Sequence, residues 1–451
     1  MRSRVRNASY DFPVDVPDVR YARAGGVAIA YQVVGEGPRD LVYAPHLTDL
    51  YCLWHAPYLR AFLDRLVREV RLIVFNPRGT GLSDRPRNVT LEARMDDIAA
   101  VLDAIGSERA TLFGVATGAN VCALFAAMYP ERCDRLVLSR PYPRATRSES
   151  YPYGPTEEQL LTWIRETRER WGDRAYLESY FRSNEPALAE SQEDLDWSIW
   201  QHRLAVSPAA AADFGRLALE TDITDVLGSI RVPTLVLHRE DERGVAGFVA
   251  DRIRDVRTVE LRGLGGSPYS ADAADALLEF VRGETRPAVP DSVLATVLFT
   301  DLVGSTERVA GLGDKAWRKL LQRHHAAVRG ELARHRGVEI DTAGDGFFCR
   351  FDGPARAIAC AQRIVEAART LELEVRAGVH IGECEVAGDK IAGIAVVTGA
   401  RISALALPGE VLVSQTVRDL VAGSGFAFED RGEHELKGVP GTWRLYSVSD
   451  G

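Results

Sequence analysis

Cysteine is scarce in this sequence, and the six cysteines present are scattered without a CxxC pair. This pattern excludes a disulfide framework and a zinc site built from paired cysteines, and it indicates the reduced thiols of a cytoplasmic protein. No apolar run is long enough to cross a bilayer, and the basic N-terminus lacks the apolar segment of a signal peptide. Positive charge is not in excess, because the net charge is −9. We therefore expect no membrane span and no nucleic-acid binding.

Short apolar runs alternate with helix-like segments over residues 20–283. The runs end at turns, and most are separated by amphipathic patterns. This alternation predicts an α/β fold with a mostly parallel sheet and helices on both of its faces. The expected strands lie in DLVYAP, RLIVFNP, ATLFGV, RLVLSRP and VPTLVLH.

The strand pattern stops between about residues 144 and 230, where amphipathic helices carry tryptophans. We interpret these side chains first as packing residues; the alternative is a helical cap over a pocket for a small apolar ligand. A proline-containing stretch at residues 284–292 then predicts a linker. The tryptophans in question are Trp163, Trp171, Trp197 and Trp200.

A different pattern fills residues 293–449. It begins with a strand, VLATVLFTDL, and a long helix that Gly337 is expected to end. A hairpin, a second helix and another strand follow. The order strand, helix, hairpin, helix, strand predicts a ferredoxin-like α+β core.

Four motifs give residues 20–283 a resemblance to the α/β-hydrolase family: NPRGTGLSDRP, FGVATG, VPTLVLHREDE and LRGLGGSPY. The resemblance places the catalytic triad at Ala116, Asp241 and Gly266. Serine attack needs a hydroxyl, a base and an acid that orients the base. Ala116 has no hydroxyl and Gly266 cannot act as a base, while Thr117 lies one position from the apex without a base of its own. We expect this half to be catalytically silent.

Two aspartates stand at chain positions suited to phosphate chemistry. Asp301 ends a buried strand and precedes a glycine-containing turn and a helix start, where backbone N–H groups can bind phosphate. Asp345 lies at a glycine-flanked hairpin tip. In a ferredoxin-like sheet the strand and the hairpin can be neighbours, so the two carboxylates can converge on a metal pair.

The second half resembles the catalytic domain of class III nucleotidyl cyclases. The resemblance rests on FTDLVGST, DTAGDGF, AGIAVVTGARIS and ELKGVPGTWRLY, which occur in the family's order. It implies a homodimer with active sites at the interface of two subunits. It also implies attack of a ribose 3′-hydroxyl on the α-phosphate, with pyrophosphate leaving.

The resemblance assigns roles to individual residues. Asp301 and Asp345 bind two Mg²⁺ or Mn²⁺ ions, and Thr306 touches the triphosphate. Arg401 stabilises the transition state, and Lys437 binds phosphate. The neighbouring His324 and His325 do not share a helix face, so we interpret them as ordinary surface or interface residues.

Three positions of the substrate site depart from the adenylate cyclase pattern. Asp341 stands where a lysine reads adenine, Lys390 stands where an aspartate does, and Val397 replaces an asparagine that orients the ribose. We expect ATP as substrate, with a guanylate cyclase or a weakly selective cyclase as the alternative. A catalytically weak pseudocyclase that acts as a scaffold is the other alternative. The silent first half is then expected to be a sensor.

Overall fold

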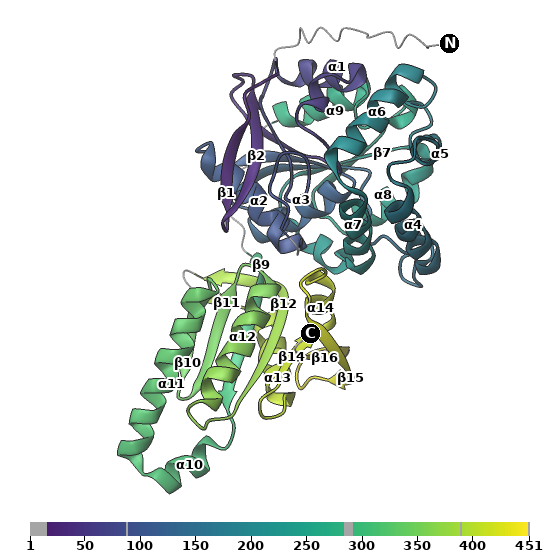
Figure 1. The fold of residues 1–451 in the computed structure, drawn as a ribbon. Helices are drawn as coiled ribbons and strands as arrows, with labels where there is room; N and C mark the ends of the chain where they lie inside the picture. Colours follow the sequence, from purple (N-terminus) through teal and green to yellow (C-terminus); the bar gives the residue numbers. More distant parts are fainter. Residues whose placement is uncertain (1–15, 87–88, 284–291, 388–389, 450–451) are drawn as a thin grey trace, which may run out of the picture.

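The computed structural model describes residues 16–86, 89–283, 292–387 and 390–449. The chain forms two sheets, each with its own helices, and the first sheet lies above the second in Figure 1. The expected linker falls almost entirely on residues 284–291, outside the described residues. In the described ranges no helix combines the length and the hydropathy that crossing a bilayer requires.

The first sheet has the strand order β1-β2-β4-β3-β5-β6-β7-β8, parallel from β4 onward and antiparallel at the β1 edge. Every residue of β5 is buried, as expected for the centre of a parallel sheet covered on both faces. The five strands predicted here are confirmed. The strands are β1 (Arg20–Ala24), β2 (Val27–Val34), β3 (Asp40–Ala44), β4 (Arg71–Phe75), β5 (Ala110–Val115), β6 (Cys133–Ser139), β7 (Thr234–His238) and β8 (Val256–Glu260).

Helices cover both faces of this sheet, and a cap of four helices replaces the strands between β6 and β7. One face packs on α1 (Pro57–Leu66) and α9 (Ala271–Arg282), the other on α2 (Leu91–Ala104), α3 (Thr117–Met128) and α8 (Arg243–Ala250). The cap consists of α4 (Glu157–Arg170), α5 (Arg174–Asn184), α6 (Gln192–Ala205) and α7 (Pro208–Glu220). Short 3₁₀ helices are η1 (Cys52–Trp54), η2 (Thr224–Ser229), η3 (Glu240–Glu242) and η4 (Gly263–Gly266).

The second sheet has the order β10-β11-β9-β12-β14-β16-β15, with β13 paired to β12. The predicted order of strand, helix, hairpin, helix and strand is confirmed by β9, α11, β10–β11, α12 and β12. The elements are β9 (Ser292–Leu302), α10 (Ser305–Leu312), α11 (Asp314–Arg334), β10 (Val338–Ala343), β11 (Gly346–Phe351), α12 (Pro354–Arg369), β12 (Val375–Ala387), β13 (Lys390–Ala392), α13 (Ile394–Leu405), β14 (Val411–Ser414), α14 (Gln415–Leu420), β15 (Ala427–Glu435) and β16 (Thr442–Ser449).

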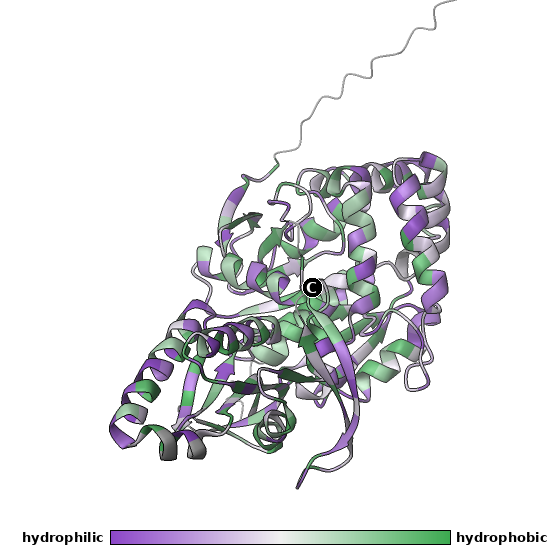
Figure 2. Cartoon of the chain, turned by 60° about the horizontal axis from the view of Figure 1, so that its bottom comes forward, coloured by the Kyte–Doolittle hydropathy of each residue, from purple (hydrophilic) through white to green (hydrophobic). Residues whose placement is uncertain are grey.

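Alternate residues of β9 face opposite sides of this sheet. Leu294 and Leu298 join the cluster beneath α11 and α12, whereas Val297 and Phe299 face α13. Figure 2 shows apolar residues gathered mainly in the interior of both halves and hydrophilic residues mainly on the outer sides of the helices. The end of α11 differs from the prediction: the left-handed residue is Arg336 at φ 57°, and Gly337 instead leaves room for the ring of Phe351.

The two halves meet through α2 and the start of α12. Buried Glu92 accepts a hydrogen bond from the backbone N–H of Ala355 at 2.9 Å, and Arg356 lies 3.2 Å from the same carboxylate. Arg356 also pairs with Asp96 of α2 and, at 2.7 Å, with Asp352. The helix α3 packs against β9, so one apolar cluster runs through both halves.

Candidate active site

The fold brings Asp301 and Asp345 to the same edge of the second sheet. Asp301 is near the end of β9, and Asp345 lies in the tight turn between β10 and β11. The strands β9 and β11 are hydrogen-bonded neighbours, with Phe347 opposite Thr300. A side chain at Gly346 would lie 3.9 Å from Asp301 Oδ1. The glycine after Asp345 therefore leaves the space between the two carboxylates open.

The free oxygens of this pair fit a divalent cation. Asp345 Oδ2 is buried and has no hydrogen-bond partner. Asp301 Oδ2 accepts from Arg376 Nε and Nη2 at 3.1 and 2.5 Å. Within the described residues, no group of three or more His, Cys, Asp or Glu side chains could hold a metal. Mg²⁺ is commonly coordinated by one or two protein carboxylates, and substrate phosphates and water complete its coordination shell.

The turn after Asp301 leads directly into a helix start, where backbone N–H groups are free to meet an anion. Gly304 adopts the left-handed conformation at φ 68°, and α10 starts directly after it. A pocket of about 380 Å³ lies against this turn and is lined by Val303, Gly304, Arg308 and Glu374. Thr306 is in the first turn of α10, and its side chain lies outside the described part of the structure.

Helix α11 supports the hairpin that carries Asp345. His325 Nε2 lies 3.1 Å from the carbonyl oxygen of Gly344, and its ring packs edge-on against Phe347. The interpretation of His324 as a surface or interface residue is wrong. His324 is 1% exposed within the described chain, and burial lowers its pKa to about 4, so it is a neutral core residue.

One expected base-reading position lies on the β10–β11 hairpin, and the other lies on β13, which pairs with β12. Asp341 is exposed on β10, and its Oδ1 accepts from the backbone N–H of Thr342 at 2.9 Å. Its register partner Phe348 stacks on Phe299 with ring centroids 4.5 Å apart. Lys390 starts β13, and its backbone pairs with Ala387; its side chain is not described.

The helix α13 exposes a stripe that contains Val397 and Arg401. Both residues share one helical face with Ile394 and Leu405, and the apolar members are 39–53% exposed. Arg401 Nε donates to the backbone oxygen of Lys437 at 3.1 Å. The fold thus joins Arg401 to the backbone of Lys437 and places Asp301 and Asp345 at one end of the sheet, and no hydrogen bond or ion pair in the described ranges links the two pairs directly.

Arg376 is the functional side chain that the sequence did not single out. Besides holding Asp301, it donates from Nη1 to the carbonyl oxygen of Ala404 on α13 at 3.1 Å. It therefore ties the end of β9 to the exposed helix. Its signal in the sequence is an arginine inside the apolar strand EVRAGVHIG.

The first sheet retains a nucleophile turn without a nucleophile. Ala116 has φ 52° and ψ −115°, a strained conformation for a residue with a side chain. A Cβ atom at Gly114 would meet Ala119 at 2.6 Å, and one at Gly118 would meet the oxygen of Ala44 at 2.1 Å. The glycines therefore serve the close packing of helix and sheet.

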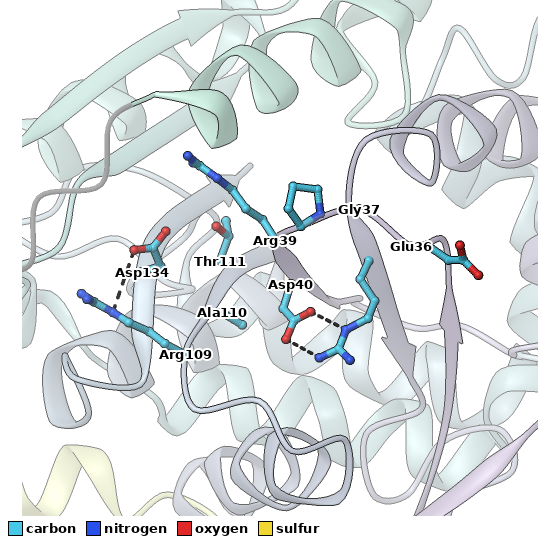
Figure 3. Close-up of a pocket in the computed structure, with 10 residues that line it drawn as sticks. Glu36, Gly37, Arg39, Asp40, Arg109, Ala110, Thr111 and Asp134 are labelled. Carbon is cyan, nitrogen blue, oxygen red and sulfur yellow. Dashed lines mark hydrogen bonds and ion pairs between the residues drawn. The ribbon is translucent and has the colours of Figure 1, made fainter.

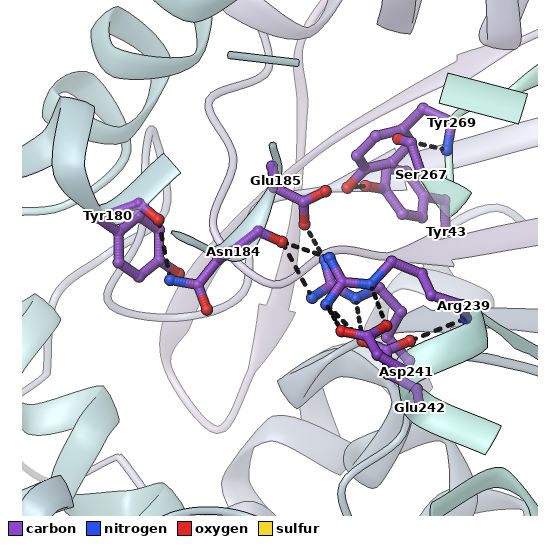
Figure 4. A network of polar contacts seen from close by, with 10 residues as sticks. Tyr43, Tyr180, Asn184, Glu185, Arg239, Asp241, Glu242, Ser267 and Tyr269 are labelled. Atoms are coloured by element: carbon purple, nitrogen blue, oxygen red, sulfur yellow. Dashed lines mark hydrogen bonds and ion pairs between the residues drawn. The ribbon is translucent and has the colours of Figure 1, made fainter. Parts of the chain in front are cut away.

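An arginine occupies the place of the missing histidine. Arg239 donates from Nε and Nη2 to the two oxygens of Asp241 at 3.0 and 3.1 Å, as Figure 4 shows. A Cβ atom at Gly266 would lie 2.4 Å from Cγ of Arg239. A histidine at Gly266 would thus collide with Arg239, which already pairs with the acid at the third triad position.

Thr117 does have a neighbouring imidazole, contrary to the expectation from the sequence. His46 Nδ1 lies 2.8 Å from Thr117 Oγ1. Burial lowers the pKa of His46 to about 3, so this imidazole is a weak base. The distance of 71 residues along the chain hid the pair.

A pocket of about 560 Å³ lies at the opposite end of the first sheet (Figure 3). It surrounds the amino ends of β3, β5 and β6, whereas ligands of α/β sheets bind at the carboxyl ends. Its arginines are engaged: Arg71 pairs with Asp40 at 2.5 Å, and Arg109 lies 3.9 Å from Asp134.

The two halves match two protein families. Residues 51–261 match the model of the alpha/beta hydrolase fold, and residues 290–450 match that of the adenylate and guanylate cyclase catalytic domain. Both predicted folds are confirmed: an α/β-hydrolase fold precedes an adenylate/guanylate cyclase catalytic domain.

Individual relatives cover one half each. The putative carbamate hydrolase RutD of Caulobacter sp. (strain K31) is 28% identical over 283 residues, which are 58% of this chain and 99% of that protein. The putative adenylate cyclase 3 of Rhizobium meliloti (strain 1021) is 32% identical over 156 residues, which are 32% of this chain. This chain spans about a quarter (26%) of that relative. A hydrolase from Pseudomonas aeruginosa PA01 has the first fold, with 24% identity and a TM-score of 0.50 over 59% of this chain and 99% of its own.

Proposed function

We propose that the second half is a nucleotidyl cyclase that converts ATP to cyclic AMP and pyrophosphate. The observation that carries this proposal is the pair Asp301 and Asp345 beside the glycine turn that starts α10, with Asp345 Oδ2 buried and unpartnered. In the reaction O3′ of the ribose loses its proton and bonds to the α-phosphorus, and the bond from that phosphorus to the pyrophosphate oxygen breaks. Two bound Mg²⁺ or Mn²⁺ ions supply activation of the hydroxyl and neutralisation of the pyrophosphate.

The side chains of the chain itself have separate tasks in this proposal. Asp345 and Asp301 hold the metal ions, and Arg376 keeps Asp301 in position through two hydrogen bonds. The turn at Gly304 and the start of α10, which includes Thr306, receive phosphate oxygens. Arg401 and Lys437 offer cations to the phosphates in the transition state.

We propose that these two sets combine across a homodimer. Within one chain Arg401 points outward with Val397, Ile394 and Leu405 on the exposed face of α13. The ring pair Phe299–Phe348 is also only partly buried on this side of the sheet. An apolar stripe around a catalytic arginine suits a second copy, which would bring its Asp301 and Asp345 to that arginine.

Weak selectivity between ATP and GTP follows from the base-reading positions. An ionised Asp341 can only accept hydrogen bonds, which suits the N1–H and amine of guanine and also the amine of adenine. Lys390 can donate to the base in either case. Val397 offers the ribose no hydrogen bond, and this favours the second candidate, a slow pseudocyclase that binds nucleotide.

The first half is proposed to act as a sensor without hydrolytic activity. Its triad positions hold Ala116, Gly266 and an Asp241 paired with Arg239. The helix α2 holds the start of α12 through Glu92 and Asp96, so a movement of α2 would act directly on the cyclase half.

Product analysis tests the cyclase proposal. The full chain is incubated with each nucleoside triphosphate and Mn²⁺, and cyclic products are identified by mass spectrometry. Asp345→Asn should abolish the product and bound Mn²⁺ in electron paramagnetic resonance without lowering the Tm, because the buried Oδ2 has no partner to lose. The matched control is Glu366→Gln, an exposed carboxylate on α12, which should behave as wild type. Nucleotide binding without product would favour the pseudocyclase.

A further inference from the structure

The turn that carries Asp345 is a two-residue hairpin turn. Ala343 and Gly346 pair across it, so Gly344 and Asp345 are its central residues. Gly344 has φ 64°, whereas Asp345 keeps a negative φ. A positive φ at the first central position alone is the type II′ arrangement, which favours glycine there. The carbonyl of Gly344 and the N–H of Asp345 form the central peptide of this turn.

The central peptide is the adjustable part of such a turn. Turning this peptide over changes ψ of Gly344 and φ of Asp345, and it converts type II′ into type I′ while the flanking strands stay in place. Type I′ needs a positive φ at both central positions, which an aspartate tolerates. The carboxylate of Asp345 would then point in another direction, because its Cα adjoins the turned peptide. A contact that holds the peptide therefore holds the direction of a metal-binding side chain.

His325 of α11 makes a contact of this kind. Its Nε2 lies 3.1 Å from the carbonyl oxygen of Gly344. A carbonyl oxygen can only accept, so Nε2 carries the proton and donates it. The ring also meets Phe347, which is 2% exposed, edge-on with ring centroids 5.0 Å apart. A polar and an aromatic contact thus hold the imidazole against the central peptide.

The same edge of α11 anchors the strand before the turn, and this helix runs along β10 in Figure 1. Arg329, one helical turn after His325, donates from Nε and Nη2 to the two oxygens of Glu339 on β10, each at 2.8 Å. Thr342 Oγ1 donates to Glu339 Oε1 at 2.7 Å. Because these bonds hold β10 itself, loss of the His325 contact should free the tip of the hairpin and leave its strands in place.

We propose that His325 is a positioning residue for Asp345, whose carboxylate it directs into the metal site by fixing the Gly344–Asp345 peptide. Asp345 Oδ2 has no hydrogen-bond partner of its own, so its direction depends on the backbone that carries it. The assignment rests on the proposed metal-dependent function and adds a residue that touches neither metal nor nucleotide. It gives His325 a task beyond that of the surface or interface residue expected from the sequence.

Mn²⁺ titration of the full chain, followed by electron paramagnetic resonance, tests this role. His325→Phe keeps a ring beside Phe347 but removes the donor, and it should weaken Mn²⁺ binding by about 3- to 10-fold, as expected for one neutral hydrogen bond. His325→Gln supplies an amide N–H in place of Nε2–H and should recover most of the affinity. The Mn²⁺ concentration for half-maximal cyclase activity should shift by the same factor, with KM for ATP at saturating Mn²⁺ unchanged.

The matched control is His335→Phe, just after the last residue of α11, where the imidazole faces the backbone oxygen of Glu331. This variant should bind Mn²⁺ as wild type does. A role of His325 in folding alone would lower the Tm and leave the Kd for Mn²⁺ unchanged. His325→Leu, which also lacks a donor, replaces His325→Phe if the latter does not fold.

Equal Mn²⁺ affinity in wild type and the donor-free variants, or a loss in His325→Gln as large as in His325→Phe, would overturn the assignment. If wild type binds Mn²⁺ but forms no cyclic product, the proposed function fails, while the Mn²⁺ affinities still decide the role of His325. If wild type binds no Mn²⁺, the metal site and this assignment fall together.

Discussion

Replacing Glu92 by glutamine should remove a loss of folding stability that grows with pH at the contact between the two halves. Glu92 is 6% exposed and faces Arg356, Asp352, Asp96 and the N–H of Ala355. Burial raises its pKa from 4.5 to about 7, and Arg356 opposes this shift without cancelling it. Glutamine keeps the shape and can still accept from Ala355, but it carries no charge.

The magnitude follows from proton linkage. Between pH 4.5 and 7 the unfolded chain has released the proton of Glu92 while the folded chain still holds it, so the free energy of unfolding falls as pH rises. Each pKa unit is worth about 1.36 kcal/mol, and a shift of about 2.5 units gives an upper value of about 3 kcal/mol. The stabilisation that the protonated Glu92 gives the folded chain is fully present below pH 4.5 and lost above pH 7.

Denaturant unfolding of wild type and Glu92→Gln at half-unit pH steps measures this difference. The stability of the variant relative to wild type should increase by up to about 3 kcal/mol across the window and level off above it. For the control Glu366→Gln, on the exposed side of α12, the free energy of unfolding should change with pH in the same way as that of wild type. A difference between Glu92→Gln and wild type that stays constant with pH would refute the assignment of a buried, proton-holding Glu92.

Four further outcomes follow from the sites. Asp345→Ala should abolish cyclase activity and leave the circular dichroism spectrum unchanged; retained activity would remove this aspartate from the site. The first half should neither cleave p-nitrophenyl esters nor be labelled by serine-directed phosphonates. Ala116→Ser should be equally inactive, because the side chain of Arg239 lies against Gly266, where a catalytic histidine would be needed. Labelling within residues 110–120 of the wild-type chain would contradict this prediction. Deleting residues 1–285 should change the cyclase rate, and identical kinetics would end the sensor proposal. The ratio of kcat/KM for ATP and GTP should stay near tenfold, since one mispaired buried polar group costs about 1–3 kcal/mol; a ratio above about a thousandfold would show that other groups read the base.

The sequence predicted both folds because their signals are local. Short apolar runs bounded by turns indicate strands, and their spacing by helices indicates parallel pairing. The convergence of Asp301 and Asp345 could be expected for the same reason, since a strand end and a hairpin tip at one sheet edge follow from the order of elements alone.

The partners of the site residues could not be predicted. Arg376 and Asp301 are 75 positions apart, and their hydrogen bonds depend on the register between β9 and β12. The side chain of Arg239 lies against Gly266 because of the rotamer that Arg239 adopts, and no pattern in the chain encodes that rotamer. The imidazole next to Thr117 comes from the loop after β3, a contact created by sheet order and not by sequence spacing.

The packing of α3 against β9 has a consequence for recombination of such chains. The turn at Ala116 leads into α3, α3 contacts β9, and β9 carries Asp301 next to its last residue. A chimera that keeps the linker but imports a foreign hydrolase would therefore lose the helix that packs against β9, the strand that carries Asp301. Productive exchange would have to transplant the surfaces of α2 and α3 together with the partner half, because one apolar cluster runs through both halves.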